Sequence, residues 1–215
     1  MFYPAAIIGH FEAKNMKVSE RKHLALIEAA QQEFVEHGFS AANMDRVCEK
    51  AGTSKRTLYR HFDSKDGLFI AAMNDVLQQQ RQKVTFSYTP NRELKIQLCE
   101  YLNAKLDALY QDCGLLLAKM VISEFLRTPE FAERYVAQLR SIDHQLEQWI
   151  SDAIDDEKLN DCDPKVMSHM LNCLVQGHFF WPQLLTHQEM RSSVERQSTI
   201  DNILVLFLSG YERKS

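Results

Sequence analysis

The sequence predicts an all-α protein with a small N-terminal helical domain and a larger C-terminal one. Glycine and proline are scarce, at seven and five residues, which argues against a fold rich in strands and tight turns. Apolar residues recur every three or four positions along most of the chain, which is the spacing of amphipathic helices. The length of 215 residues suits one small module joined to one of medium size.

The N-terminal part is predicted to contain four helices. The first is amphipathic, with Ser19 as its expected N-cap and Gly38 at its end. The second is short and ends at Gly52, which can adopt the positive φ of a tight turn. The fourth and longest is expected over residues 65–82. The second, third and fourth helices each follow a side chain that can accept a hydrogen bond from a free backbone amide: Asn43, Ser54 and Ser64.

The C-terminal part is predicted to contain five longer helices, beyond a linker that covers residues 85–91. Pro129 and Pro164 stand at predicted first turns, where an amide hydrogen would have no intrahelical partner. Pro182, in contrast, falls inside a predicted helix and should kink or break it. The five helices are expected near residues 92–110, 114–127, 129–154, 164–187 and 193–212.

The cysteine content and the lack of long apolar runs favour a cytoplasmic protein. Five cysteines without a C-x-x-C pair fit neither a disulfide framework nor a zinc cluster: Cys48, Cys99, Cys113, Cys162 and Cys173. No apolar run approaches the length of a membrane span, and residues 5–8 are too few for the core of a signal peptide. Met16 is a second possible start, so residues 1–15 are assigned no fold.

Positive charge is concentrated around the third predicted helix. The net charge of -4 gives no overall nucleic-acid signature, but residues 50–65 hold five basic side chains against Asp63 alone. Residues 152–163 show the reverse, with six acids against Lys158. We interpret this second stretch as a solvated acidic loop rather than a catalytic one.

Residues 43–61 have the pattern of a helix-turn-helix. Two short helices are joined by a glycine turn, and the second is rich in Lys, Arg, Thr, Tyr and His. On that second helix Leu58 and Phe62 can anchor one side while the polar side chains face a DNA groove. Guanidinium and ammonium groups suit guanine edges and phosphates, and a threonine methyl can contact thymine. The alternative is an ordinary solvated basic face.

The motifs of this region resemble the head of the tetracycline-repressor (TetR) family. They are Gly38-Phe39, residues 44–48 and residues 51–69, whose core is Thr57-Leu58-Tyr59-Arg60-His61-Phe62-Asp63-Ser64-Lys65. The likeness covers about residues 21–72. It implies a bacterial-type homodimer whose recognition helix enters the major groove of a palindromic operator in double-stranded DNA. The DNA-binding residues that it implies are Asn43, Lys55, Arg56, Thr57, Tyr59, Arg60, His61 and Lys65, the last at the position of a phosphate-binding lysine.

Two positions depart from the family pattern. Ala42 stands where a threonine usually contacts a phosphate, so we expect that contact to be missing or replaced by Asn43. Cys48 stands where alanine is usual. We interpret Cys48 as a core residue rather than a redox sensor, because no neighbour in the sequence clearly lowers its pKa.

The resemblance further implies that the C-terminal domain senses a ligand and forms the dimer. In the family the last two helices build a four-helix bundle across the dimer axis, here about residues 164–185 and 194–211. The seam is predicted at Val166, Met170, Leu174, Gly177, Ile203, Leu204, Phe207 and Leu208, with an intramolecular core as the alternative. A ligand pocket is predicted at Tyr110, Met120, Phe125, Trp149, His178, Phe179 and Trp181, with plain core as the alternative for each.

We therefore expect a flexible arm at residues 1–18, a helix-turn-helix domain at 19–66, and a ligand-sensing and dimerisation domain at 67–215. The expected function is that of a sequence-specific transcriptional regulator, by default a repressor, modulated by an unknown small-molecule effector. We find no catalytic motif and expect no metal or cofactor, since His169 and Cys173 have a metal-ligand spacing without a third ligand. The rivals are a helical enzyme or carrier with an incidental basic helix, and a structural DNA-binding protein without a sensor pocket.

Overall fold

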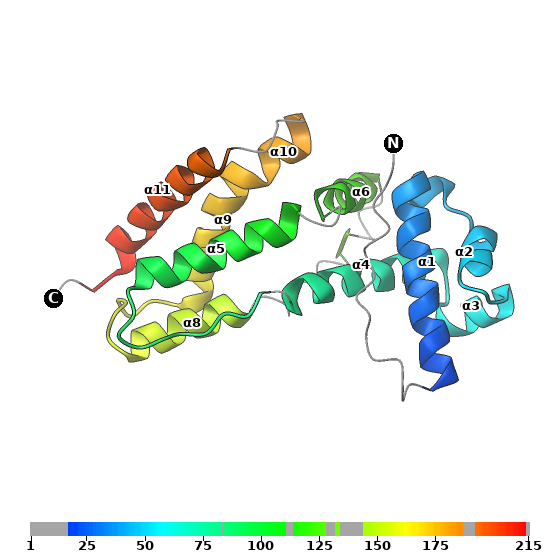
Figure 1. Cartoon of the computed structure of the whole chain (residues 1–215), viewed down its shortest axis with the longest axis horizontal. Coiled ribbons are helices and arrows are strands. Elements are labelled where there is room, and N and C mark those ends of the chain that lie inside the picture. The colour runs from blue at the N-terminus through cyan, green and yellow to red at the C-terminus, as the bar shows by residue number, and fades with distance from the viewer. Residues whose placement is uncertain are drawn as a thin grey trace. The chain divides into compact units, whose positions relative to one another are not determined.

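The protein is all-helical, as the sequence predicts. The computed structural model describes residues 17–82, 84–110, 114–127, 132–133, 144–186 and 192–213. Apart from one isolated bridge between Leu159 and Glu212, the regular structure of these residues consists of helices (Figure 1). None of the described helices has the length and hydropathy that a membrane span requires. The chain divides into two compact units, the first formed by residues 1–81 and 112–136 and the second by residues 82–111 and 137–215.

Unit 1 contains the N-terminal helices together with one helix from further along the chain. Its core is formed by side chains that the helical spacing of the apolar residues turns inward, among them Phe34, Leu58 and Phe69, all of which are buried. The first helix contacts the second and also α6. The helices of unit 1 are α1 (Val18–Ala41), α2 (Met44–Lys50), α3 (Lys55–His61), α4 (Lys65–Gln82) and α6 (Gly114–Arg127).

The three predicted side-chain caps of α2, α3 and α4 are confirmed. The oxygens of Asn43, Ser54 and Ser64 accept hydrogen bonds from backbone amides two or three residues further on, at 2.7, 3.2 and 3.0 Å. The predicted cap of the first helix is wrong, because α1 begins at Val18 and Ser19 lies inside it. The backbone amide of Lys17 is instead satisfied by the Glu20 carboxylate, at 3.0 Å.

Gly38 and Gly52 adopt positive φ angles, of 73° and 60°. At Gly52 the turn leads from α2 to α3, as the sequence predicts. At Gly38 the prediction of a helix end is only half right, because helical structure resumes after the kink and continues to Ala41. The short segment that follows Gly38 contributes Phe39 and the carbonyl of Ser40 to the base of α4.

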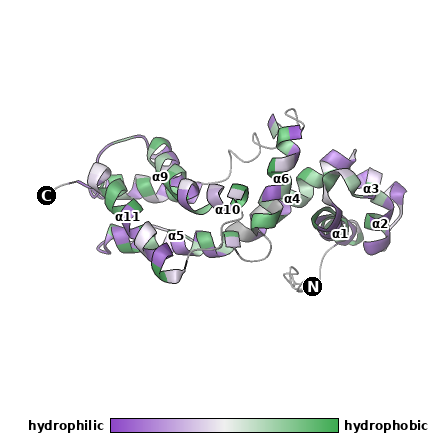
Figure 2. Ribbon diagram, turned by 90° about the horizontal axis from the view of Figure 1, so that it is seen from above, coloured by the Kyte–Doolittle hydropathy of each residue, from purple (hydrophilic) through white to green (hydrophobic). Residues whose placement is uncertain are grey.

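Unit 2 is a second helical core. Trp149, Leu146, Phe179 and Leu204 are fully or almost fully buried at its centre. The colours in Figure 2 alternate between hydrophilic and hydrophobic along α9 and α11, as expected for helices with one buried and one exposed face. The helices of unit 2 are α5 (Leu94–Tyr110), α8 (His144–Asp155), α9 (Pro164–Phe179), α10 (Trp181–Thr186) and α11 (Ser193–Tyr211).

The predicted helix limits in the C-terminal part can be compared with those observed. The limits of α6 agree with the prediction, and the predicted break near Pro182 is confirmed, because α9 ends at Phe179 and α10 begins at Trp181. Only the second half of the helix predicted at 129–154 is described, from His144. Residues 1–16 of the predicted arm, Cys113, residues 128–131 and residues 134–143 lie outside the described part of the chain.

The segment predicted as a linker, residues 85–91, is packed against unit 2. The ring of Phe86 stacks on Trp149 with the centroids 5.4 Å apart. Buried Gln97 accepts hydrogen bonds from the Thr89 amide at 2.9 Å and from the Trp149 indole at 3.1 Å. The Tyr88 hydroxyl donates to Asp156 at 2.6 Å, and burial together with this carboxylate raises the pKa of Tyr88 to about 12. Residues 85–91 therefore pack against the core of unit 2 and do not form a flexible linker.

Candidate nucleic-acid interface

Helix α3 is held by one apolar side and presents the other to solvent. Leu58 and Phe62 are buried, and Val47 of α2 is fully buried as well. The Thr53 amide donates to the carbonyl of Cys48 at 2.9 Å, which closes the turn at Gly52. Since two buried side chains fix the rotation of α3, its remaining side chains face outward in a defined order.

The outward face of α3 carries the side chains predicted to read DNA. Lys55, Arg56, Tyr59 and Arg60 are all exposed. No described residue forms an ion pair with Arg56 or Arg60, so both guanidinium groups are available for phosphates or base edges. This is the chemistry that the major groove of DNA requires from a recognition helix.

Lys55 differs from its arginine neighbours because it already has a partner. Its ammonium lies 2.8 Å from the carboxylate of Asp45 on α2, and hydrogen bonding and charge from Asp45 raise the pKa of Lys55. The pair links the two helices of the motif on their exposed side. A DNA phosphate that contacts Lys55 must therefore share its ammonium group with Asp45 or displace the Asp45 carboxylate.

Asn43 and Thr57 use their side-chain oxygens within the protein. Asn43 caps α2, and the Thr57 hydroxyl lies 3.1 Å from the hydroxyl of Ser54, next to the cap of α3. These contacts fix the start of both helices of the motif. The sequence alone assigns both residues to DNA, whereas the structure also gives each of them a local structural role.

Lys65 likewise has a role that the sequence does not reveal. Its ammonium donates hydrogen bonds to the carbonyls of Ser40 and Ala42, at 3.1 and 2.9 Å. It also lies 4.9 Å from the centre of the Phe39 ring, within the range of a cation–π interaction. Because an ammonium group has three donors, one remains for a phosphate. Lys65 thus fastens the start of α4 to the connection between α1 and α2.

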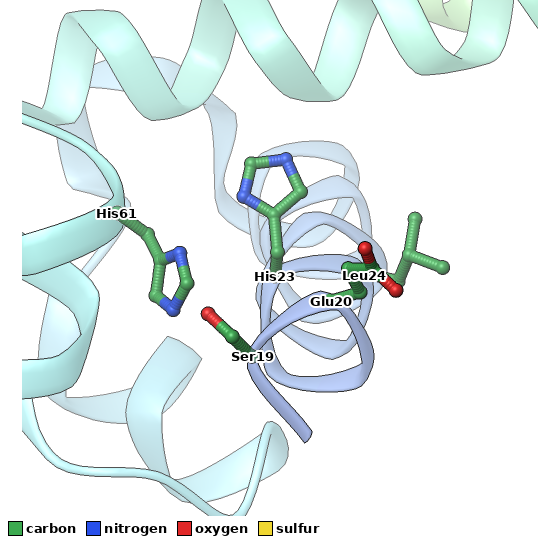
Figure 3. Close-up of a pocket in the computed structure, with 5 residues that line it drawn as sticks. All are labelled: Ser19, Glu20, His23, Leu24 and His61. Carbon is green, nitrogen blue, oxygen red and sulfur yellow. The ribbon is translucent and has the colours of Figure 1, made fainter. Parts of the chain in front are cut away.

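His61 lies at the end of α3 and points back toward the first helix. Figure 3 shows its ring directed toward Ser19 and His23, at a small cavity of about 350 Å³ between these elements. The His23 ring stacks on Phe62 with the centroids 4.8 Å apart. Burial, assisted by His23 and two nearby basic residues, lowers the pKa of His61. The ring therefore faces α1 rather than the outward side of α3 where the predicted DNA contacts lie.

A buried carboxylate that the sequence analysis missed holds this motif in place. Glu33 of α1 accepts hydrogen bonds from the Asn43 amide at 2.9 Å and from the Arg46 guanidinium at 2.8 Å. Burial raises the pKa of Glu33, but the hydrogen bonds and the positive charges of Arg46 and His37 outweigh it, and the net shift is downward. The sequence did contain a signal for this role. Glu33 is an acidic residue among the buried positions of an amphipathic helix, directly before Phe34.

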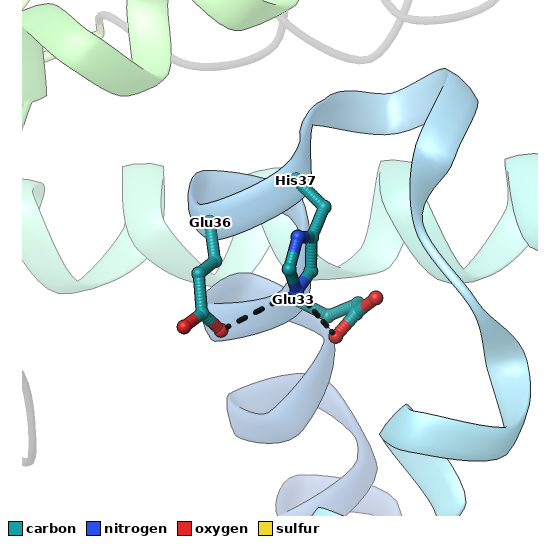
Figure 4. A group of neighbouring side chains, drawn as sticks. All are labelled: Glu33, Glu36 and His37. Carbon is teal, nitrogen blue, oxygen red and sulfur yellow. Dashed lines mark ion pairs between the residues drawn. The ribbon is translucent and has the colours of Figure 1, made fainter.

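Glu33, Glu36 and His37 form a group with a spacing that could hold a cation (Figure 4). Lys50 already fills this role, with its ammonium 2.9 Å from Glu36 and 3.6 Å from Glu33. Arg46 neutralises the other oxygen of Glu33. The group is therefore an ion-pair network that joins α1 to α2 and fixes the angle at which α2 and α3 leave the first helix.

Two parts of the chain match known families. Residues 26–72 match the family described as bacterial regulatory proteins, tetR family, and residues 96–213 match the C-terminal domain of AefR-like transcriptional repressors. The chain belongs to the TetR family. TetR-family proteins are DNA-binding transcriptional regulators rather than enzymes.

Several TetR-family proteins are similar to the chain, two of them over most of its length and one over a shorter part of it. The crystal structure of a TetR-family regulator from Pseudomonas syringae pv. tomato is 30% identical with a TM-score of 0.73, covering 91% of this chain and 99% of that one. The transcriptional regulator RutR of Escherichia coli O157:H7 is 23% identical over 205 residues, 92% of this chain and 93% of RutR. The transcriptional activator FasR of Mycolicibacterium smegmatis is 40% identical over 65 residues, 30% of this chain and 29% of FasR.

The predicted dimer seam of this TetR-family chain needs revision on α11. Val166, Met170 and Gly177 of α9 are exposed, and Leu174 is partly buried against the core. The four predicted residues of α11 are buried by their own unit, so their side chains are not open to a partner: Ile203, Leu204, Phe207 and Leu208. The apolar side chains that α11 exposes are Val205 and Leu206, at 58% and 61%. An interface on this helix must use that opposite face.

The predicted ligand-pocket residues are divided between the two units. Met120 and Phe125 lie on α6 in unit 1, and the others lie in unit 2. Trp149 and Phe179 are core residues, and the Tyr110 hydroxyl donates to the Phe179 carbonyl at 2.5 Å. His178 and Trp181 are exposed. Met120 alone among the seven lines one of the two cavities described here.

Two predictions about cysteines can be checked directly. Cys48 is buried in unit 1, and burial raises the pKa of its thiol, which agrees with a core residue rather than a reactive one. The Cys173 sulfur lies 3.6 Å from a ring nitrogen of His169 on the exposed side of α9. Among the described residues no third ligand completes a metal site around this pair.

Proposed function

We propose that the protein is a repressor that binds a palindromic operator as a homodimer and responds to a small-molecule effector in its C-terminal domain. The observation that carries the proposal is the outward face of α3. There Arg56 and Arg60 are unpaired within the described chain and Tyr59 is exposed, while buried Leu58 fixes the orientation of the helix. Such a face reads base edges and phosphates of a major groove.

Repression is favoured over activation by the C-terminal half of the chain. Residues 96–213 resemble a domain described from transcriptional repressors. The similarity to the activator FasR covers only 30% of this chain. A regulator bound over a promoter blocks it by occupancy alone, so repression needs no surface beyond the DNA-binding face.

The homodimer is supported by the exposed apolar residues of unit 2. Val166 and Met170 on α9 and Val205 and Leu206 on α11 are large apolar side chains left in contact with solvent. Exposed apolar residues at helical spacing on the last long helices are suited to contact with a second copy. A two-fold dimer presents two α3 helices at a fixed separation, about one duplex turn of 34–36 Å or a multiple of it.

An effector changes DNA affinity only through its difference in affinity for the two conformations of the dimer. A ligand that binds both conformations equally tightly shifts nothing. An effector that lowers operator affinity must therefore prefer the conformation in which the two α3 helices do not match successive grooves.

The test is selection from random duplex DNA by the purified chain at near-physiological salt, followed by sequencing of the retained duplexes. Recovery of an inverted repeat supports a dimeric, sequence-specific regulator and yields its operator. Retention without a common sequence, together with a steep dependence on salt, would favour a structural DNA-binding protein. No retention in the presence or absence of candidate effectors would contradict the proposal. A rise in melting temperature with a small molecule supports the sensor role.

A further inference from the structure

The cleft between α1 and α6 in unit 1 has the form of a small-molecule site. Its volume is about 420 Å³. Phe34 and Phe39 line it from the first helix, and Leu116 and Met120 line it from α6. The two helices are in direct contact and belong to the same compact unit. The cleft is thus a hollow with aromatic and aliphatic walls, the composition typical of sites for organic ligands.

Glu124 projects from α6 into this cleft and is almost completely buried. Its exposed fraction is 8%. Within the described residues no hydrogen bond or ion pair to its carboxylate is present. Buried acidic side chains are normally paired, because an ionised carboxylate loses its hydration when it leaves water. Glu33, in the same unit, has such partners, and Glu124 lacks them.

The other charged groups around the cleft are engaged elsewhere. Arg127 stands three residues after Glu124 on α6, yet its guanidinium donates to the hydroxyl of Ser40 at 2.8 Å. His37 lies near the carboxylates of Glu33 and Glu36. Lys119 also already takes part in an interaction and is not a free cation. The oxygens of Glu124 are not among the described side-chain atoms that are closed off from solvent without a hydrogen bond, so its carboxylate reaches the open space of the cleft and can pair with a ligand there.

We propose that the α1–α6 cleft binds an organic cation with an aromatic or aliphatic body. Its ammonium group pairs with the Glu124 carboxylate, and its body packs against Phe39, Leu116 and Met120. A charge-assisted hydrogen bond in a partly dehydrated site is stronger than a neutral one, which selects the cation over neutral molecules of equal shape. The site lies within unit 1, shares only Met120 with the effector pocket predicted from the sequence, and does not depend on operator binding.

Three probes that share a phenylethyl body test the proposal: 2-phenylethylamine, 2-phenylethanol and 3-phenylpropanoate, which carry positive, zero and negative charge. Their affinities for the full chain are measured by saturation-transfer NMR and calorimetry in the absence of DNA. The amine should bind about tenfold more tightly than the alcohol. In Glu124→Gln the amine should bind no better than the alcohol. Glu28→Gln, an exposed substitution of the same type on α1, should leave all three affinities unchanged.

A second measurement separates a binding role from a structural one. If Glu124 is kept for a ligand, then Glu124→Gln, which removes no contact within the described chain, leaves the melting temperature of the free protein unchanged. Leu116→Ala, on the exposed edge of the cleft, should weaken all three probes without unfolding the chain. Preferred binding of 3-phenylpropanoate would assign the cleft to anions through Lys119 and Arg127 and would overturn the proposal. Equal amine affinity in the wild type and Glu124→Gln, or a lowered melting temperature, would overturn it as well.

Discussion

Replacing Glu33 by glutamine removes one charge from the centre of unit 1 and changes almost nothing in size. The side chain is fully buried and accepts hydrogen bonds from Arg46 and the Asn43 amide, and Lys50 lies 3.6 Å away. Glutamine keeps an oxygen for the amide but loses the charge that pairs with Arg46. A hydrogen bond to a charged group contributes about 1.5–3 kcal/mol, so we expect a loss of about 2 kcal/mol in the free energy of unfolding.

Urea denaturation followed by far-UV circular dichroism measures this loss. With a slope of about 2 kcal/mol per molar urea, the midpoint should fall by about 1 M. Glu28→Gln on the exposed side of the same helix is the matched control and should change the stability by less than about 0.5 kcal/mol. Equal midpoints for Glu33→Gln and Glu28→Gln would refute the reasoning that Glu33 anchors the motif.

Three further predictions concern DNA binding, assembly and pH. Arg56→Ala should weaken binding to the selected operator by about 1–3 kcal/mol and relax its sequence preference in fluorescence anisotropy titrations; unchanged selectivity would remove Arg56 from the base-reading residues. Leu206→Glu should shift the chain toward monomer in sedimentation experiments, whereas Leu126→Glu, on the exposed side of α6 in unit 1, should not. Because burial lowers the pKa of His61 below its ordinary 6.5, the unfolded chain takes up that proton first. The melting temperature should therefore fall as the pH drops through about 6.5, and His61→Asn should flatten this slope.

Local features of the fold were predictable because their causes lie within a few residues. A side-chain cap needs an acceptor two or three residues before a free amide, and Asn43, Ser54 and Ser64 provide one. The break at Pro182 follows from a missing amide hydrogen. Ser19 failed as a cap because Glu20 satisfies the amide of Lys17 and the helix starts one residue earlier than Ser19.

Features that depend on distant partners were not predictable from the pattern. Helix α11 is apolar at consecutive positions from Ile203 to Leu208, so periodicity alone does not say which side faces its own core. The structure assigns Leu204 and Phe207 inward and Val205 and Leu206 outward. The packing of residues 85–91 on unit 2 likewise depends on Gln97 and Trp149, which are close in space and 52 positions apart in the sequence.

The same limit applies to the candidate DNA interface. The exposed basic face of α3 was predictable, because a short capped helix with two apolar anchors leaves few choices for its other side chains. Two other features were not predictable from the sequence: the inward orientation of the His61 ring and the two hydrogen bonds from Lys65 to carbonyls. Their partners belong to α1 and to the connection after it. For these two residues the family resemblance suggests a DNA contact, and the structure adds an attachment of the DNA-binding helices to the rest of unit 1.

Unit 1 holds two buried glutamates that differ in their partners, and this difference gives their substitutions different expected effects on stability. Glu33 is surrounded by Arg46 and Lys50 of α2 and by the amide of Asn43, so removal of its charge leaves Arg46 without its ion-pair partner and lowers stability. Glu124 has no donor among the described residues, so removal of its charge breaks no contact of the fold and leaves stability unchanged. Stability that is lost at Glu33 and unchanged at Glu124, together with amine binding that is lost in Glu124→Gln, would mean that the first carboxylate is retained for the fold and the second for a molecule that the chain binds.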